Sequence, residues 1–187
     1  MKKFFSKIKN RILVDKFPWL MPVNVWTGKP LEDYDYSYTL YDEIPDGWRK
    51  CFGKMMIKEM HKASGGEIYT EQIKEKYGEL RWYCSANEET QRIISKYSFI
   101  SQHVCIDCGR PDTYITNTGW ICPICESCWN KNKSPLSYKE VVCEEEGENI
   151  IPDSYRVSRF SKDGEELFEY DISDTVCKIR RKWRFCK

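Results

Sequence analysis

The sequence predicts an α+β fold: a small core of helices and a β-hairpin, an inserted four-cysteine module, and a C-terminal β-hairpin followed by a basic helix. Three observations support this fold class. Apolar residues recur at helical spacing in several segments, alternating segments meet in pairs at turn sequences, and two C-x2-C pairs stand between them. The 187 residues are enough to bury a core, and the aromatic content of 14% excludes a disordered chain.

Residues 1–18 are predicted to form a basic amphipathic helix. Its apolar residues recur at helical spacing among lysines: Phe4, Phe5, Ile8, Ile12 and Leu13. Phe17-Pro18 ends the pattern. We expect the apolar face to pack on the protein's own core or on a partner, and not on a membrane surface. Residues 19–45 are rich in Pro, Tyr and Asp without a period, which predicts an extended aromatic and acidic arm.

Residues 46–102 are predicted to form the α+β core. A first helix is expected with Asp46 as its N-cap and Gly65-Gly66 at its end. Residues 68–74 and 80–84 alternate around Tyr77-Gly78, which predicts a β-hairpin. Asn87 is the expected N-cap of a second helix that continues through Ser101.

Residues 103–133 carry the strongest chemical signal, two C-x2-C pairs with zinc-ribbon spacing. The predicted ligands are Cys105, Cys108, Cys125 and Cys128. Four sulfurs close a tetrahedral coordination sphere and leave no position for water or substrate, so the expected cofactor is a structural Zn²⁺. Gly109 permits the left-handed turn of a knuckle, and residues 120–121 are expected to form a short strand before the second pair. A thioredoxin-like redox dithiol is disfavoured because it needs a single C-x-x-C in a βαβ setting.

Two other residues are alternative ligands. Cys122 forms an overlapping C-x2-C pair with Cys125, but the locked φ of Pro123 fits that turn poorly, so Cys125 and Cys128 are preferred. His103 stands two residues before Cys105 and is either an alternative ligand, a second hydrogen-bonding group or a packed side chain.

Residues 134–187 are predicted to form a β-hairpin and a basic C-terminal helix. Strands are expected at residues 138–143, 155–161 and 166–172, with an Asp-Gly turn at residues 162–165. Ser173 or Asp174 is the expected cap of the last helix. The candidate residues for binding nucleic acid or an acidic partner are Lys178, Arg180, Arg181, Lys182, Trp183 and Arg184. The competing interpretation is that this basic end pairs with acidic blocks of the same chain, such as residues 144–148.

The cysteines outside the four predicted ligands indicate the compartment. They are scattered and lack the dense spacing of a secreted disulfide scaffold, which predicts a reducing cytoplasm. No stretch reaches the length of a membrane span, and Lys7, Lys9 and Arg11 interrupt any signal-peptide core.

Several runs carry a resemblance to a family. They are Met21-Pro-Val-Asn-Val-Trp-Thr-Gly, Asp33-Tyr-Asp-Tyr, Pro45-Asp-Gly-Trp-Arg-Lys, Ile73-Lys-Glu-Lys-Tyr-Gly-Glu-Leu-Arg-Trp-Tyr and Cys105-Ile-Asp-Cys-Gly. Over most of its length the chain resembles small uncharacterised zinc-ribbon proteins of bacteriophages and prophages. The resemblance implies a viral protein that works in the cytoplasm of a bacterial host, where small accessory proteins redirect host machinery or block defences. It implies no known activity.

The sequence does not indicate an enzyme. His61 and His103 are the only histidines, and neither lies in a catalytic motif. A zinc deaminase would need an H-x-E motif, which His61-Lys-Ala does not supply. We therefore expect a non-catalytic zinc-binding protein that binds and inhibits or sequesters a host component, including a component of host defence. The expected partner is a host protein or a nucleotide ligand. The alternative is a nucleic-acid-binding zinc-ribbon protein that uses the basic C-terminal segment.

Overall fold

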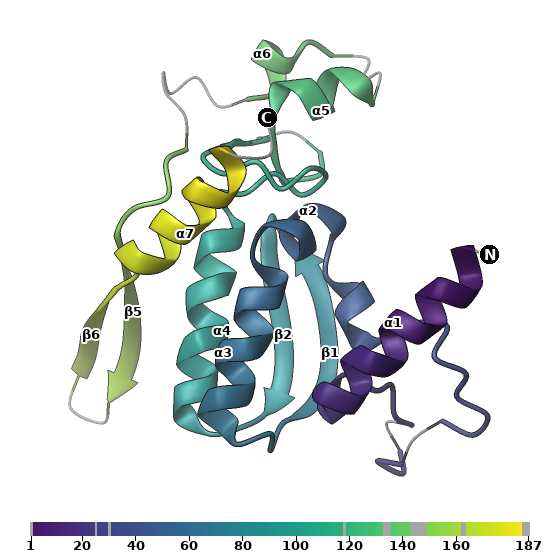
Figure 1. Cartoon of the computed structure of the whole chain (residues 1–187). Helices are drawn as coiled ribbons and strands as arrows, with labels where there is room; N and C mark the ends of the chain where they lie inside the picture. Colours follow the sequence, from purple (N-terminus) through teal and green to yellow (C-terminus); the bar gives the residue numbers. More distant parts are fainter. Residues whose placement is uncertain are drawn as a thin grey trace.

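The computed structural model describes residues 2–24, 26–29, 31–117, 119–132, 136–142, 149–161 and 164–184, and its fold is α+β as predicted. Helices α3 (Lys54–Ser64) and α4 (Glu88–Ser101) lie across one face of the hairpin made by β1 (Tyr69–Lys76) and β2 (Glu79–Ser85) (Figure 1). The cysteine module lies at one end of this layer pair, and a second hairpin and helix α7 lie beside α4.

The first predicted core helix is not continuous. Helix α2 (Asp46–Trp48) begins directly at Asp46, after Pro45, so the prediction of Asp46 as an N-cap was wrong by one residue. A turn of π-helix (Arg49–Gly53) separates α2 from α3, and α3 ends as predicted at Gly65 in the left-handed conformation. The wider π turn accompanies the burial of Trp48, Cys51 and Phe52 in the core.

The central hairpin and the second core helix are confirmed. Strands β1 and β2 pair antiparallel from Tyr69↔Ser85 to Lys76↔Glu79. Tyr77 and Gly78 both have positive φ, at 55° and 78°, which is what a two-residue type I′ turn requires. The side chain of Asn87 accepts a hydrogen bond from the Thr90 N–H at 2.9 Å, so it caps α4 as expected.

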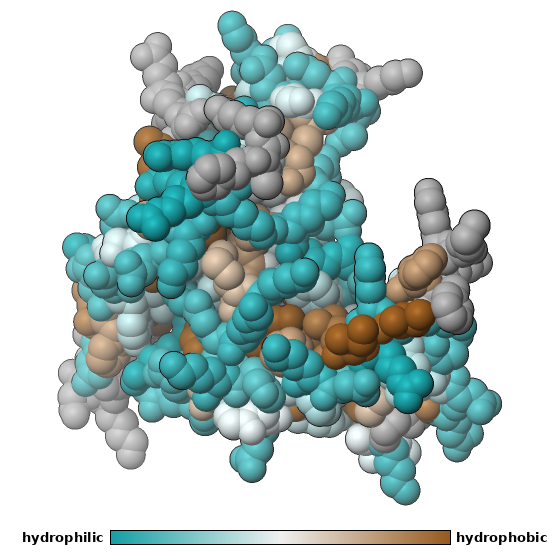
Figure 2. Space-filling model, viewed as in Figure 1, coloured by the Kyte–Doolittle hydropathy of each residue, from teal (hydrophilic) through white to brown (hydrophobic). Residues whose placement is uncertain are grey.

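The C-terminal end of helix α1 (Lys2–Lys16) packs on the core, while the side chain of Phe4 lies outside the described part of the helix. Val14 and Phe17 are buried, and so are Trp19 and Leu20 of the following 3-10 turn η1 (Pro18–Leu20). Ile8 and Ile12 are exposed at 42% and 63%, and Figure 2 shows hydrophobic surface along α1. The expectation that the whole apolar face packs therefore holds for one part of the helix. In the arm that follows, a second 3-10 turn η2 (Leu40–Glu43) anchors Tyr41 in the core.

The C-terminal segment contains the predicted hairpin. Strands β5 (Ser154–Ser161) and β6 (Gly164–Asp171) pair antiparallel, and their turn lies outside the described residues. Helix α7 (Ser173–Arg184) already begins at Ser173, so the prediction of Ser173 or Asp174 as its cap was wrong. Instead, the Asp171 carboxylate accepts a hydrogen bond from the Ser173 N–H at 2.8 Å.

The predicted strand at residues 138–143 was wrong. This segment forms a short helix, α6 (Tyr138–Val141), because Ser137 and Glu140 form a capping box in which each side chain binds the other's backbone N–H. Val142 follows in extended conformation and bridges to Thr116, while Cys143 lies outside the described residues.

A single hydrophobic cluster joins the arm, the core and the C-terminal helix. Phe52 of the π turn stacks on Tyr97 of α4 with ring centroids 5.3 Å apart, and both are fully buried. Val176 and Ile179 of α7 belong to the same cluster. In the described part of the chain, no helix is long and apolar enough to cross a lipid bilayer.

Candidate metal centre

The first cysteine pair sits in a tight turn that backbone hydrogen bonds hold. The Gly109 N–H donates to the Cys105 carbonyl at 2.9 Å, and the Cys105 N–H donates to the Arg110 carbonyl at 2.8 Å. Gly109 has a φ of 87°, a left-handed conformation that glycine adopts without steric cost. The turn aims the thiols of Cys105 and Cys108 toward the same point.

This turn docks directly on the helical core. The Gly47 N–H donates to the Ile106 carbonyl at 2.8 Å, and the Trp48 indole N–H donates to the Val104 carbonyl, also at 2.8 Å, in a buried site. The two backbones approach so closely that no side chain fits between them. A Cβ built on Gly109 would lie 2.5 Å from the Gly47 oxygen, and a Cβ on Gly47 would lie 2.2 Å from the Cys105 oxygen.

The second cysteine pair opens helix α5 (Glu126–Lys131). Cys125 is its N-cap residue, and the Cys128 N–H and the Trp129 N–H both donate to the Cys125 carbonyl at 3.0 Å. A short ladder of β3 (Tyr114–Ile115) and β4 (Pro123–Ile124) leads into this pair, so the strand predicted at residues 120–121 was wrong by a few residues. The Ile106 N–H donates to the Pro123 carbonyl at 2.8 Å and ties the two cysteine turns together.

The four predicted cysteines form one group. The Sγ atoms of Cys105, Cys108, Cys125 and Cys128 all lie within 4.8 Å of one another. The Sγ atoms of Cys108 and Cys125 are 3.6 Å apart, and the Cys125 N–H points at the Cys105 Sγ at 3.4 Å. Three of the residues are buried and Cys108 is partly exposed. Four sulfurs at these separations could hold one metal ion, and no disulfide joins them.

The electrostatics of the group favour a cation at its centre. Hydrogen bonds from the Cys105 and Cys108 thiols lower the pKa of Cys125, while the same kind of contact, with Cys105 and Cys125, raises the pKa of Cys108. Burial raises the pKa of Cys128. Four thiolates this close together repel one another, and a divalent ion offsets that repulsion.

The two alternative ligands lie outside the group. Cys122 faces Thr116: its backbone N–H donates to the Thr116 hydroxyl at 2.9 Å, and its Sγ lies 4.0 Å from that oxygen. His103 turns the other way, with Nδ1 3.3 Å from the Asn149 carbonyl and its ring edge-on to Phe99. Burial lowers the pKa of His103, which favours the neutral imidazole.

The basic residues of α7 divide into two sets. Arg180 donates two hydrogen bonds to the Asp112 carboxylate, at 3.0 and 3.1 Å, and a third to the Ile151 carbonyl at 3.0 Å. Lys182 donates to the Cys51 carbonyl at 2.9 Å and to the Lys50 carbonyl. These two residues hold α7 on the protein. Lys178, Arg181 and Arg184 are exposed and form no ion pair with another described residue.

Sequence reasoning missed the residues that position the site. Gly47 and Trp48 hold the first cysteine turn, and Asp112, between the two pairs, receives Arg180. A Gly-Trp pair and a lone Asp are common in loops, so no local signal identifies them. The comparisons with known proteins add no assignment: no family model, curated protein or solved structure matches this chain. The resemblance to phage zinc-ribbon proteins stays a prediction.

Proposed function

We propose that this chain is a non-catalytic, zinc-stabilised protein that acts by binding a host protein stoichiometrically. The observation that carries the proposal is the closed four-sulfur site. A metal ion held by four cysteines has no open position for substrate, and such sites serve to stabilise folds. The four-cysteine site therefore stabilises the fold, and the protein acts through surfaces that bind a partner.

Zinc is the metal that the ligand set favours. Four thiolates in tetrahedral geometry select zinc or iron–sulfur chemistry over magnesium and calcium, which prefer oxygen ligands. With zinc–sulfur bonds of about 2.3 Å, a regular tetrahedron places its sulfurs about 3.8 Å apart. The 3.6 Å separation of the Cys108 and Cys125 sulfurs fits this value without rearrangement.

Zinc would stabilise more than the cysteine module. The first cysteine turn is bonded to Gly47 and Trp48 of α2, and the segment between the pairs carries Asp112, which binds Arg180 of α7. An ion that fixes the cysteines would also hold these two contacts in place, so it would couple the module to the core and to the C-terminal helix.

The resemblance to phage and prophage proteins points to a bacterial host and its cytoplasm as the setting. In that reducing compartment the free thiols stay available for metal. A host target is tested by adding tagged, zinc-loaded protein to bacterial lysate and then titrating each captured component in purified form. We expect a 1:1 complex and a binding curve that breaks near molar equivalence. A full effect at a small fraction of the target's concentration, with a chemically altered target, would contradict the proposal and indicate an enzyme.

The second candidate function is binding of single-stranded nucleic acid by α7. Trp183 lines two hollows of about 360 and 500 Å³. Lysine and arginine side chains line both hollows: Lys50, Arg110, Arg180, Lys182 and Arg184. An indole beside cations is the arrangement that stacks bases and attracts phosphates.

The two sets of basic residues allow a matched test of this second function, with oligo-dT as the probe. Replacing Lys178, Arg181 and Arg184 by Gln should weaken binding and reduce the slope of log K against log salt by about 2. Arg180→Met should instead lower stability, because Arg180 binds Asp112. An unchanged salt slope in the triple variant would exclude α7 as the nucleic-acid site.

A further inference from the structure

Strand β5 has one edge whose backbone groups bond to no described residue. The Ile172 N–H donates to the Asp153 carbonyl at 2.8 Å, so residues 153 and 172 form a hydrogen-bonded pair. Such pairs alternate along an antiparallel ladder, and residues between them turn their N–H and C=O groups outward. In the register of β5 and β6, the outward residues of β5 include Ser154, Arg156 and Ser158. The backbone groups of Arg156 and Ser158 have no hydrogen-bond partner among the described residues.

The corresponding edge of β2 is covered at Leu80 and Cys84. The Leu80 N–H donates to the Ser101 hydroxyl at 2.8 Å, and the Leu80 carbonyl accepts from the Ser98 hydroxyl at 2.7 Å. Further along, the Cys84 carbonyl accepts from the Gln91 amide at 3.0 Å. Helix α4 therefore protects the edge of β2 at these two positions, as edge strands usually require, whereas no described residue bonds to the β5 edge at Arg156 and Ser158.

The free edge of β5 borders a groove. A hollow of about 430 Å³ lies between β5 and β2, and the floor is the side of α4 that carries Ile94, Ser98 and Phe99. The two strands run in the same direction, away from the cysteine module (Figure 1). A segment laid antiparallel to β5 would therefore also be antiparallel to β2.

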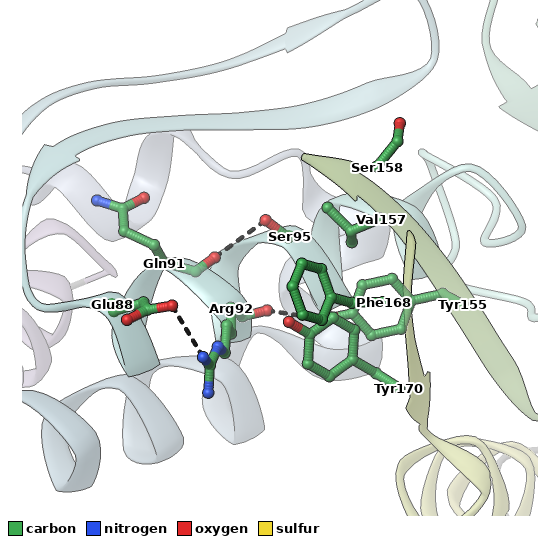
Figure 3. A pocket seen from close by; sticks show the side chains of 9 residues that line it. All are labelled: Glu88, Gln91, Arg92, Ser95, Tyr155, Val157, Ser158, Phe168 and Tyr170. Carbon is green, nitrogen blue, oxygen red and sulfur yellow. Dashed lines mark hydrogen bonds and ion pairs between the residues drawn. The ribbon is translucent and has the colours of Figure 1, made fainter. Parts of the chain in front are cut away.

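A second hollow adjoins the first and is suited to an apolar side chain. It has a volume of about 420 Å³ and lies between α4 and the inner face of the β5–β6 hairpin (Figure 3). Tyr155, Val157, Phe168 and Tyr170 form its apolar wall. The Tyr155 hydroxyl donates to the Arg92 carbonyl at 3.1 Å and its ring stacks on Tyr170 at 4.9 Å, so this wall is fixed before any ligand arrives.

Arginine side chains stand on both sides of the groove. Arg81 of β2 and Arg156 of β5 line the hollow. Arg81 contacts Glu79 at 2.6 Å, and Arg156 contacts Glu169 at 3.3 Å. The Arg156–Glu169 pair is exposed on both sides and contributes little stability, so Arg156 can exchange Glu169 for an acidic side chain in the groove at small cost. The partner of Arg81, Glu79, is only 20% exposed, but the Arg81 side chain is 43% exposed and its guanidinium has further donors for a second carboxylate.

We propose that an extended segment of the host partner pairs with β5 along Arg156 and Ser158 and becomes the third strand of the β5–β6 sheet. In this mode of recognition, backbone hydrogen bonds supply affinity and side-chain pockets supply specificity. The segment carries apolar residues toward α4, one of them in the pocket of Figure 3, and acidic residues outward between Arg81 and Arg156. This inference rests on the proposed function, since it names the surface that binds the protein partner.

The test removes one backbone donor. In the zinc-loaded full chain, Ser158→Pro deletes an N–H that faces the groove, and Pro is tolerated on an edge strand at such a position. Ser158→Ala is the matched control, because it removes the hydroxyl and keeps the N–H. The probe is a set of peptides selected on the unmodified chain from a displayed library of random 12-residue peptides. We expect selected peptides with alternating apolar and acidic residues to bind Ser158→Pro at least tenfold more weakly than Ser158→Ala.

A second measurement covers the case in which Ser158→Pro does not fold. Hydrogen exchange of the unmodified chain is compared with and without the selected peptide, and we expect protection of the Arg156 and Ser158 amides. Equal binding to both variants, unprotected amides, or a library without enriched peptides would overturn the proposal. If Ser158→Pro still forms the 1:1 complex with the host protein, only the docking surface is wrong. If the unmodified chain forms no such complex, the proposed function itself fails.

Discussion

Gly109→Ala should destabilise the protein by about 2–5 kcal/mol, from two separate contributions. Gly109 has a φ of 87°, and a residue with a Cβ in the left-handed region costs about 1–2 kcal/mol. The new Cβ would also lie 2.5 Å from the Gly47 oxygen, where ordinary van der Waals contact begins near 3.4 Å. Relief requires the cysteine turn to move away from α2, and overpacking of this kind costs about 1–3 kcal/mol more.

The Gly119→Ala variant is the control that separates the cost of the close contact with Gly47 from the cost of the left-handed backbone. Gly119 lies in the same module with a φ of 61°, but nothing lies within 4 Å of its added Cβ, so only the conformational cost applies. Thermal melts of both variants with excess zinc should differ by roughly 2–12 °C, which corresponds to the contact contribution in a chain of this size. A chromogenic zinc chelator should also extract metal faster from Gly109→Ala. Equal melting temperatures and equal extraction would refute the close docking of the cysteine turn on α2.

Four other variants give direct outcomes. Cys108→Ser should lose the metal and unfold the cysteine module, whereas Cys122→Ser should keep one zinc per chain with zinc–sulfur distances near ~2.3 Å; elemental analysis and X-ray absorption check both. Arg180→Met should lower the free energy of unfolding by about 1–3 kcal/mol in urea melts, because it strips hydrogen bonds from the largely buried Asp112 carboxylate, and a wild-type melt would contradict that role. Burial raises the pKa of Cys51 to about 12 from an ordinary value of 9.0. Between these two pH values the unfolded chain releases a proton that the folded chain retains, so stability should fall as pH rises above 9, and Cys51→Ala should show a shallower decline.

The parts of the fold that depend on local sequence were predicted well. The left-handed positions at Tyr77 and Gly78, the cap at Asn87 and the left-handed end at Gly65 each follow from the chemistry of one or two residues. The two C-x2-C pairs belong to the same class, since spacing alone brings each pair of thiols together. Turns, helix caps and paired cysteines depend on neighbouring residues and not on the rest of the fold, so they can be predicted from the sequence.

Elsewhere two local sequence signals favoured different structures, and the prediction relied on the weaker signal. Apolar residues at 138, 141 and 142 suggested a strand, but the Ser137–Glu140 capping box selects a helical turn there. The first core helix was predicted as continuous because its apolar stripe is regular. The π turn at Arg49–Gly53 depends on how Trp48, Cys51 and Phe52 fit into the core, and that packing is not a property of the stripe.

The sequence by itself determined the group of four cysteines, both hairpins and the helical periods, because each of these follows from residue type and spacing within a short stretch of chain. Only the tertiary structure decided which basic residues of α7 are already in use. Arg180 and Asp112 are 68 positions apart, and their pairing depends on where the core places α7 beside the first cysteine turn. The same holds for Gly47 against Gly109 and for the exposed edge of β5. Contacts between distant segments depend on how whole helices and strands pack, so the sequence of one segment does not determine which other segment it contacts.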